Sequence, residues 1–202
     1  MVLNIREKGG RFADAALPHP AHGLPCGVIH EFITHLCYLV LRFLPEHEPI
    51  ERIGAAWSNH GQDDLFKFDD LDATLIAGRT HARIRFSSYQ APDCFTLTVR
   101  GSRGWAETDL FQPHLKLFVP RPGGKQLTPL VNQFVNGMGL ARASVKGFRN
   151  KVLQHTAYEG LATFLERTYK ALSAGTVPPV TFDDMDRASQ LVDALLEQEN
   201  RV

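Results

Sequence analysis

Hydrophobic residues recur with a helical period over residues 28–44, the most apolar stretch of the chain. Their spacing of three or four residues places them on one face of a helix. These residues are Ile29, Phe32, Ile33, Leu36, Val40 and Phe43. Pro45 and Pro49 follow, and proline ends a helix. We expect a buried helix here and not a membrane span, because polar and charged side chains interrupt the stretch.

The period changes to two in the middle of the chain, over residues 50–119. Residues 80–87 place His81, Arg83 and Arg85 on one side and small or apolar side chains on the other. Residues 95–99 alternate in the same way, and the glycine-rich stretch 101–104 is a turn signal. Several short strands separated by turns predict an antiparallel meander, with one face covered and the other solvated or paired with a second subunit.

The two ends of the chain carry different patterns. Residues 1–6 alternate like a short strand, and the last third is helical, with amphipathic stretches over 127–152 and 156–172. Thr181 is a good N-cap for a closing helix that ends near residue 198, because acidic residues in its first turn face the positive helix end.

Composition narrows the classes of protein. The 202 residues include 22 Lys and Arg against 22 Asp and Glu, so no positive field favours nucleic acid as a partner. Three widely spaced cysteines indicate a reducing compartment. We read no targeting segment and no membrane span, and therefore expect a cytoplasmic protein. We expect one domain, 1–202, with a loop rich in Pro, His and Gly over 9–27.

Cofactor and metal motifs are missing from the sequence. The stretches 101–104 and 137–139 contain glycines, but neither matches the dinucleotide or P-loop patterns, so we expect no cofactor bound by this chain alone. His30 and His35 are one residue further apart than in HExxH and differ by about 140° around a helix. His19 and His22 have no third ligand nearby. We therefore expect no metal site.

Glu31 and His35 are four residues apart and share one face of the predicted helix, and Tyr38 follows one turn later. Two interpretations stand. In the first, a capping glutamate and a core histidine serve structure alone. In the second, a carboxylate and an imidazole line a pocket, where they hydrogen-bond a polyol or relay its hydroxyl proton.

Four segments together resemble the C-terminal domain of the glucose–fructose oxidoreductase, inositol dehydrogenase and rhizopine-catabolism (Gfo/Idh/MocA) family. The segment 27–39 is similar to the family's G-x-x-x-D-x-x-x-H helix, with Glu31 in place of Asp and His35 at the His. The others cover 69–87, 95–104 and 177–184, and they follow in the family's order.

The resemblance implies an α+β fold, like the C-terminal domain of glyceraldehyde-3-phosphate dehydrogenase. Such a domain has a large, mostly antiparallel sheet with helices on one face, and its open face often forms homo-oligomers. Intact members are NAD(P)-dependent enzymes of sugars and cyclitols. The resemblance makes Glu31 and His35 the catalytic candidates. It places His19 and His22 beside the substrate, and Tyr38 is a further substrate-binding candidate because it lies on the same polar side of the helix.

The sequence departs from the family at its cofactor half. We expect no Rossmann domain within these 202 residues, and Glu7-Lys8 is followed by Gly9 instead of the family's proline, so we equate neither residue with the family's catalytic motif. Hydride transfer needs the cofactor, so we expect the substrate-binding half of an oxidoreductase, incomplete by itself. Its cofactor half is then either lost through truncation or a mis-set start, or supplied by a separate Rossmann-domain chain. The alternatives are a non-catalytic sugar-binding or oligomerisation module and an unrelated α+β interaction protein.

Overall fold

The computed structural model describes residues 1–5, 19–45, 48–60, 67–112, 114–154 and 159–199. The chain divides into two compact units. Unit 1 consists of Met1–Cys94 and Val180–Val202, and unit 2 consists of Phe95–Pro179. Unit 1 is therefore built from two separate stretches of the sequence, and each unit is described by itself below.

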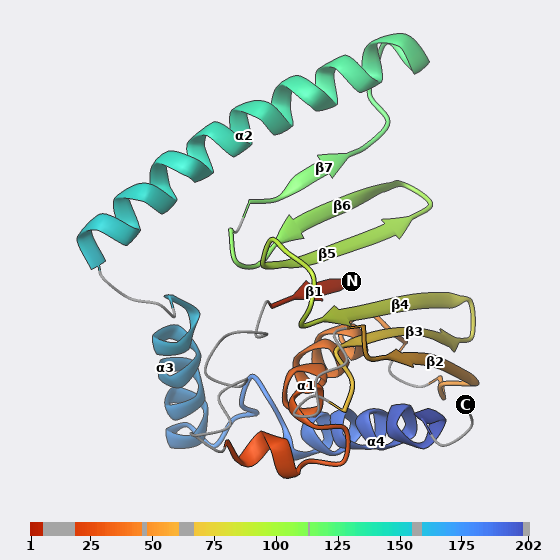
Figure 1. The fold of residues 1–202 in the computed structure, drawn as a ribbon. Coiled ribbons are helices and arrows are strands. Elements are labelled where there is room, and N and C mark those ends of the chain that lie inside the picture. The colour runs from red at the N-terminus through yellow and green to blue at the C-terminus, as the bar shows by residue number, and fades with distance from the viewer. Residues whose placement is uncertain (6–18, 46–47, 61–66, 113, 155–158, 200–202) are drawn as a thin grey trace. The chain divides into compact units, whose positions relative to one another are not determined.

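Unit 1 contains a sheet of four strands in the order β2 (Arg52–Ser58), β3 (Asp70–Ala77), β4 (Thr80–Ser87) and β1 (Val2–Asn4) (Figure 1). The pairs β2–β3 and β3–β4 are antiparallel, whereas β1 pairs with β4 in parallel. The alternation along β3 and β4 buries one face of the sheet and leaves charged side chains on the other.

Two helices cover the buried face of this sheet, α1 (Val28–Leu41) and α4 (Phe182–Glu199) (Figure 1). They pack on each other, α1 also contacts β4, and α4 contacts β2. The core between these layers is apolar. Its fully buried side chains include Leu3, Ile29, Ile33, Leu36, Leu71, Leu75, Ile84, Phe86 and Leu195.

Unit 2 contains three antiparallel strands, β5 (Cys94–Gly101), β6 (Gly104–Asp109) and β7 (Lys116–Phe118). Trp105 and Phe118 face each other across β6 and β7 with stacked rings, whose centroids are 3.7 Å apart. Two helices follow, α2 (Gly124–Gln154) and α3 (Glu159–Ser173). Of these helices, α2 packs against β7, and many of its large apolar side chains remain exposed.

The α+β class with mostly antiparallel strands is confirmed. The helix predicted over 28–44 is α1, which ends three residues earlier, at Leu41. The sequence prediction missed β3. The loop predicted over 9–27 is described only from residue 19 onward, where η2 (Pro20–Gly23) forms one turn of 3-10 helix. Among the described helices, none combines the length and the apolar character needed to cross a membrane.

Candidate functional site

Helix α1 carries a polar stripe along one side, formed by Glu31, His35, Tyr38 and Arg42. The opposite side of the helix is buried in the core of unit 1. The spacing of three or four residues aligns the stripe along the helix, from its first turn to its C-cap at Arg42. The core packing of α1 therefore fixes the direction in which the stripe faces.

Glu31 and His35 are both exposed on this stripe. Within the described residues, neither side chain has a hydrogen bond or an ion pair. His35 is thus not a core histidine, and Glu31 makes no capping hydrogen bond to the start of α1. The two groups stand one helical turn apart and are accessible to a ligand.

The other end of the stripe is a hydrogen-bonded network. The Nη2 atom of Arg42 donates to the Tyr38 hydroxyl at 2.6 Å and to Oδ2 of Asp184 in α4 at 3.2 Å. The guanidinium carbon of Arg42 also lies 4.8 Å from the centre of the Tyr38 ring, which adds a cation–π contact. Arg42 therefore links the C-terminal end of α1 to the N-terminal end of α4, 142 residues apart in sequence.

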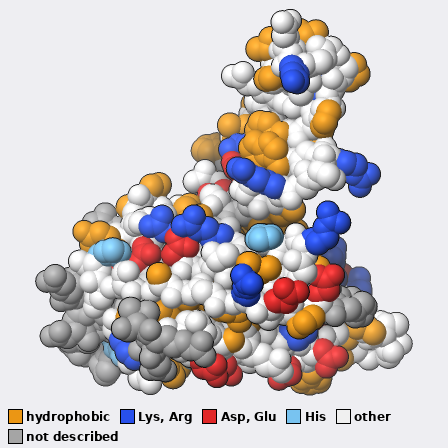
Figure 2. All heavy atoms as spheres, turned by 90° about the vertical axis from the view of Figure 1, so that its right-hand side faces the viewer, with side chains coloured by type: hydrophobic (Ala, Val, Ile, Leu, Met, Phe, Trp, Pro, Cys, Tyr) orange, Lys and Arg blue, Asp and Glu red, His pale blue; other side chains and the backbone are white. Residues whose placement is uncertain are grey.

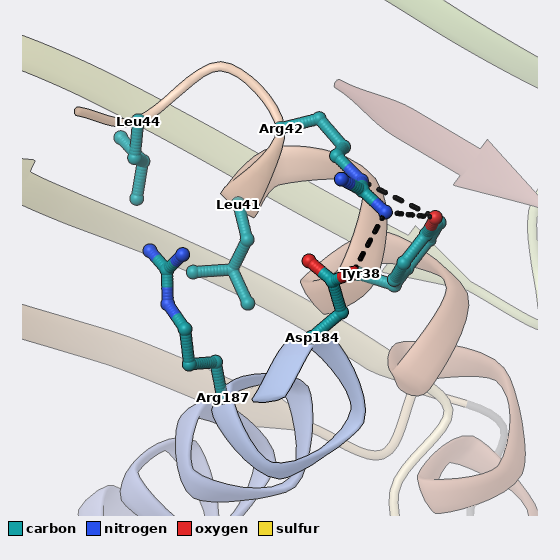
Figure 3. A pocket seen from close by; sticks show the side chains of 6 residues that line it. All are labelled: Tyr38, Leu41, Arg42, Leu44, Asp184 and Arg187. Atoms are coloured by element: carbon teal, nitrogen blue, oxygen red, sulfur yellow. Dashed lines mark hydrogen bonds and ion pairs between the residues drawn. The ribbon is translucent and has the colours of Figure 1, made fainter. Parts of the chain in front are cut away.

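A pocket of about 270 Å³ opens beside this network (Figure 3). Side chains from both helices and from the residues after α1 line it. They are Tyr38, Leu41, Arg42, Leu44, Asp184 and Arg187. Tyr38 belongs both to the stripe and to the pocket, whereas Glu31 and His35 are not among the residues that line it.

Hydrogen bonds set the protonation state of the acid in this network. The backbone amide and hydroxyl of Thr181 both donate to Asp184, and together with Arg42 they hold the pKa of that carboxyl below its ordinary value. The Tyr38 hydroxyl and the Asp184 carboxylate raise the pKa of Arg42 above its ordinary value. Both groups of the ion pair are therefore charged at neutral pH.

His19 and His22 lie at η2. The Nδ1 atom of His19 accepts a hydrogen bond from the backbone amide of Ala21 at 3.2 Å, so this ring caps the 3-10 turn. The two imidazole rings are 6.4 Å apart, edge to face. η2 packs on the start of α1 through Ala21 and Val28, which places both histidines in a segment next to the helix end that carries Glu31.

Sequence reasoning missed a buried polar cluster where β3 begins and β4 ends. Asp69 is fully buried, and its carboxylate accepts a hydrogen bond from the backbone amide of His60 at 2.8 Å. The backbone amide of Ser88 donates to the carbonyl of Asp69 at 2.8 Å. These bonds join three chain segments where β2 and β4 end and β3 begins. The sequence feature that could have revealed the cluster is the acidic residue next to a strand.

Comparisons with known proteins bear on the fold alone. No family model and no curated protein matches the sequence. The aldose-aldose oxidoreductase from Caulobacter crescentus, solved in complex with glycerol, is 14% identical with a TM-score of 0.50. The match covers 83% of this chain and 44% of that one.

A candidate oxidoreductase from Magnetospirillum magnetotacticum MS-1 is 18% identical with a TM-score of 0.37, over 72% of this chain and 52% of that chain. Of these two matches, the one to the Caulobacter protein shows that this chain shares the fold of part of that oxidoreductase. The chain spans about half the length of these two proteins. The fold that the sequence resemblance implied is confirmed.

Proposed function

We propose that this chain is the substrate-binding part of an oxidoreductase that acts on a sugar or cyclitol, related to the C-terminal domains of the Gfo/Idh/MocA family. The fold shared with an aldose-aldose oxidoreductase makes an oxidoreductase the first class to test. One observation on this chain carries the proposal. Glu31 and His35 stand exposed and without a hydrogen-bond partner in the described residues, and the sequence resemblance aligns them with the family's acid and histidine.

The chemistry of the pair suits a polyol. The Glu31 carboxylate accepts hydrogen bonds from hydroxyl groups, and the His35 imidazole donates or accepts according to its protonation. An imidazole also takes up a hydroxyl proton near neutral pH. In this proposal, Glu31 orients one hydroxyl of the substrate and His35 holds the proton of its neighbour. His19, His22 and Tyr38 would border the same substrate.

The glycine positions do not fit a dinucleotide. Gly101 and Gly104 pair with each other in the turn between β5 and β6, and Gly137 and Gly139 lie inside α2. A dinucleotide fingerprint needs its glycines between a strand and a helix. We therefore assign binding and proton transfer to this chain and no hydride step. NAD(P) would be held by a separate Rossmann-domain chain or domain.

A titration with polyols tests the proposal. Calorimetry with glycerol, D-glucose and myo-inositol should detect binding of at least one polyol, and Glu31→Gln or His35→Gln should weaken it about tenfold or more. Thr34→Ala is the matched control, because Thr34 is exposed between the two residues on the same helix. The proposal would be overturned if polyol binding were unchanged by both Glu31→Gln and His35→Gln.

A second experiment addresses the redox role. The chain mixed with a family Rossmann domain should reduce NAD or NADP in the presence of the bound polyol, and Glu31→Gln should lower that rate. Polyol binding with no reduction in any such mixture would favour the alternative, a non-catalytic sugar-binding module.

An oligomerisation module is the second candidate function. It is favoured by the exposed apolar side chains of unit 2, which Figure 2 shows as hydrophobic patches in the upper part of the view. On α2 they include Leu130, Phe134, Val145 and Phe148, each at least 61% exposed. Apolar area of this kind marks an interface. Sedimentation should detect a homo-oligomer, and Phe134→Glu and Phe148→Glu should dissociate it.

A further inference from the structure

The pocket between α1 and α4 contains an arginine, Arg187, that makes no hydrogen bond or ion pair of its own with the described residues. Asp184 pairs with Arg42 through Oδ2, and the same oxygen accepts the two hydrogen bonds from Thr181. Arg187, one helical turn further along α4, has no hydrogen bond or ion pair within the described residues. Its positive charge helps to lower the pKa of Asp184, but the ion pair of that carboxylate is with Arg42. Figure 3 shows its side chain extending past Leu41 toward Leu44, into the pocket.

The described side chains that line the pocket carry one net positive charge. Two guanidinium groups and one carboxylate line it, with Leu41 and Leu44 as the apolar part of the wall. Asp183 and Asp186 are exposed on the same helix, and neither lines the pocket. A guanidinium presents parallel N–H donors that match the two oxygens of a carboxylate, so the missing partner of Arg187 is an anion of that shape.

The remaining polar groups add a second requirement. Oδ1 of Asp184 accepts none of the hydrogen bonds that Oδ2 receives, and Figure 3 shows it turned toward the pocket. A carboxylate oxygen at the pocket wall needs a donor, and a hydroxyl group of the ligand would supply one. The volume of about 270 Å³ restricts the ligand to one small molecule, because pockets for drug-sized ligands begin near ~300 Å³.

From these groups we propose that the pocket binds a small hydroxy carboxylate, such as a sugar acid. The ligand carboxylate pairs with Arg187, a hydroxyl donates to Asp184, and the carbon chain lies against Leu41 and Leu44. This site is separate from Glu31 and His35. It does not depend on the proposed function, because it holds whether or not those two residues bind a polyol.

A titration with matched ligands tests the site. D-Gluconate should bind the complete chain at least about tenfold more tightly than D-glucose, because only gluconate carries the carboxylate. Arg187→Gln should remove that difference, and Arg187→Lys should restore part of it, since lysine keeps the charge but lacks the paired donors. Arg79→Gln in the turn between β3 and β4 is the matched control, because Arg79 is exposed in the same unit and does not line the pocket.

Two further binding measurements separate this pocket from the proposed polyol site at Glu31 and His35. Acetate should bind more weakly than gluconate, because it has no hydroxyl for Asp184. The double variant Glu31→Gln, His35→Gln should bind gluconate as the unchanged chain does, even if it loses the neutral polyol. This proposal would be overturned if gluconate and glucose bound equally well, or if Arg187→Gln left gluconate binding unchanged. Either result would leave the proposed function standing.

Discussion

The side-chain amide of Asn136 pairs with both backbone groups of Leu117. Its Nδ2 atom donates to the Leu117 carbonyl and its Oδ1 atom accepts from the Leu117 amide, each at 2.9 Å. One turn earlier on α2, Nδ2 of Asn132 donates to the carbonyl of Val119, also at 2.9 Å. Two asparagines of a helix thus occupy the edge of β7, where another strand would otherwise pair.

Replacing Asn136 by Ala should lower the free energy of unfolding by about 1–3 kcal/mol, because it removes two hydrogen bonds that each contribute about 0.5–1.5 kcal/mol. Chemical denaturation measures this loss, and faster hydrogen exchange at Leu117 locates it. Gln133→Ala, exposed on the same helix, is the control. An unchanged exchange rate at Leu117 would show that the pair adds nothing.

The N-cap of α4 is a reciprocal pair. The Thr181 hydroxyl accepts from the backbone amide of Asp184 at 3.1 Å, and the Asp184 carboxylate accepts from the backbone amide of Thr181 at 2.9 Å. Thr181→Ala should cost about 0.5–2 kcal/mol of stability, and Thr181→Ser should cost less, because serine keeps the hydroxyl. Thermal unfolding of the two variants makes the comparison.

The same cap makes stability depend on pH. The pKa of Asp184 is lower in the folded chain than in the unfolded one, so its contribution is fully present above the unfolded value. It is lost as the pH falls through the lowered folded value. Asp184→Asn should therefore destabilise the chain at neutral pH, and the difference from the unchanged chain should shrink below about pH 4. A difference that is constant with pH would contradict this linkage.

The Cys37 thiol should be unreactive in the folded chain. Burial raises its pKa to about 12, so almost no thiolate is present at pH 8. Cys94 is only partly buried and serves as the internal comparison. Mass spectrometry after a maleimide pulse should find Cys94 modified first and Cys37 modified only when denaturant is added. Equal rates at the two residues would show that α1 opens readily.

Gly78 should resist replacement. It has a φ of +52° in the turn between β3 and β4, a backbone conformation that costs other residues about 1–2 kcal/mol. Gly78→Ala should lower the melting temperature, whereas Gly54→Ala in β2 should not, because a Cβ at Gly54 meets open space at an ordinary φ. Similar losses at both glycines would place the cause outside the turn.

The sequence predicted the elements whose pattern is local. The apolar period identified α1, the alternation identified β4 and β5, and Thr181 identified the start of α4. The strand β3 was missed because Asp70 and Asp72 interrupt its apolar pattern. In the folded chain, those acids pair with Arg85 and Arg83 on the neighbouring strand, a compensation that no single window of sequence displays.

In the candidate site, too, the sequence predicted local features and missed those that depend on packing. The i, i+4 spacing of Glu31 and His35 was visible in the sequence, as was that of Tyr38 and Arg42. The contact of Arg42 with Asp184 was not, because it joins residues 142 positions apart and depends on how two helices pack. That Arg187 lines a pocket without an ion pair to a described residue could be recognised only after that packing was known.

The discontinuity of unit 1 has a consequence for biosynthesis. Helix α4 packs on α1 and β2, yet it comes after all of unit 2 in the chain. While a ribosome makes residues 95–179, the apolar surface that α4 will cover is already synthesised and still open to water. We therefore expect nascent chains halted before residue 180 to bind chaperones that recognise exposed apolar surface, and to release them once α4 has emerged.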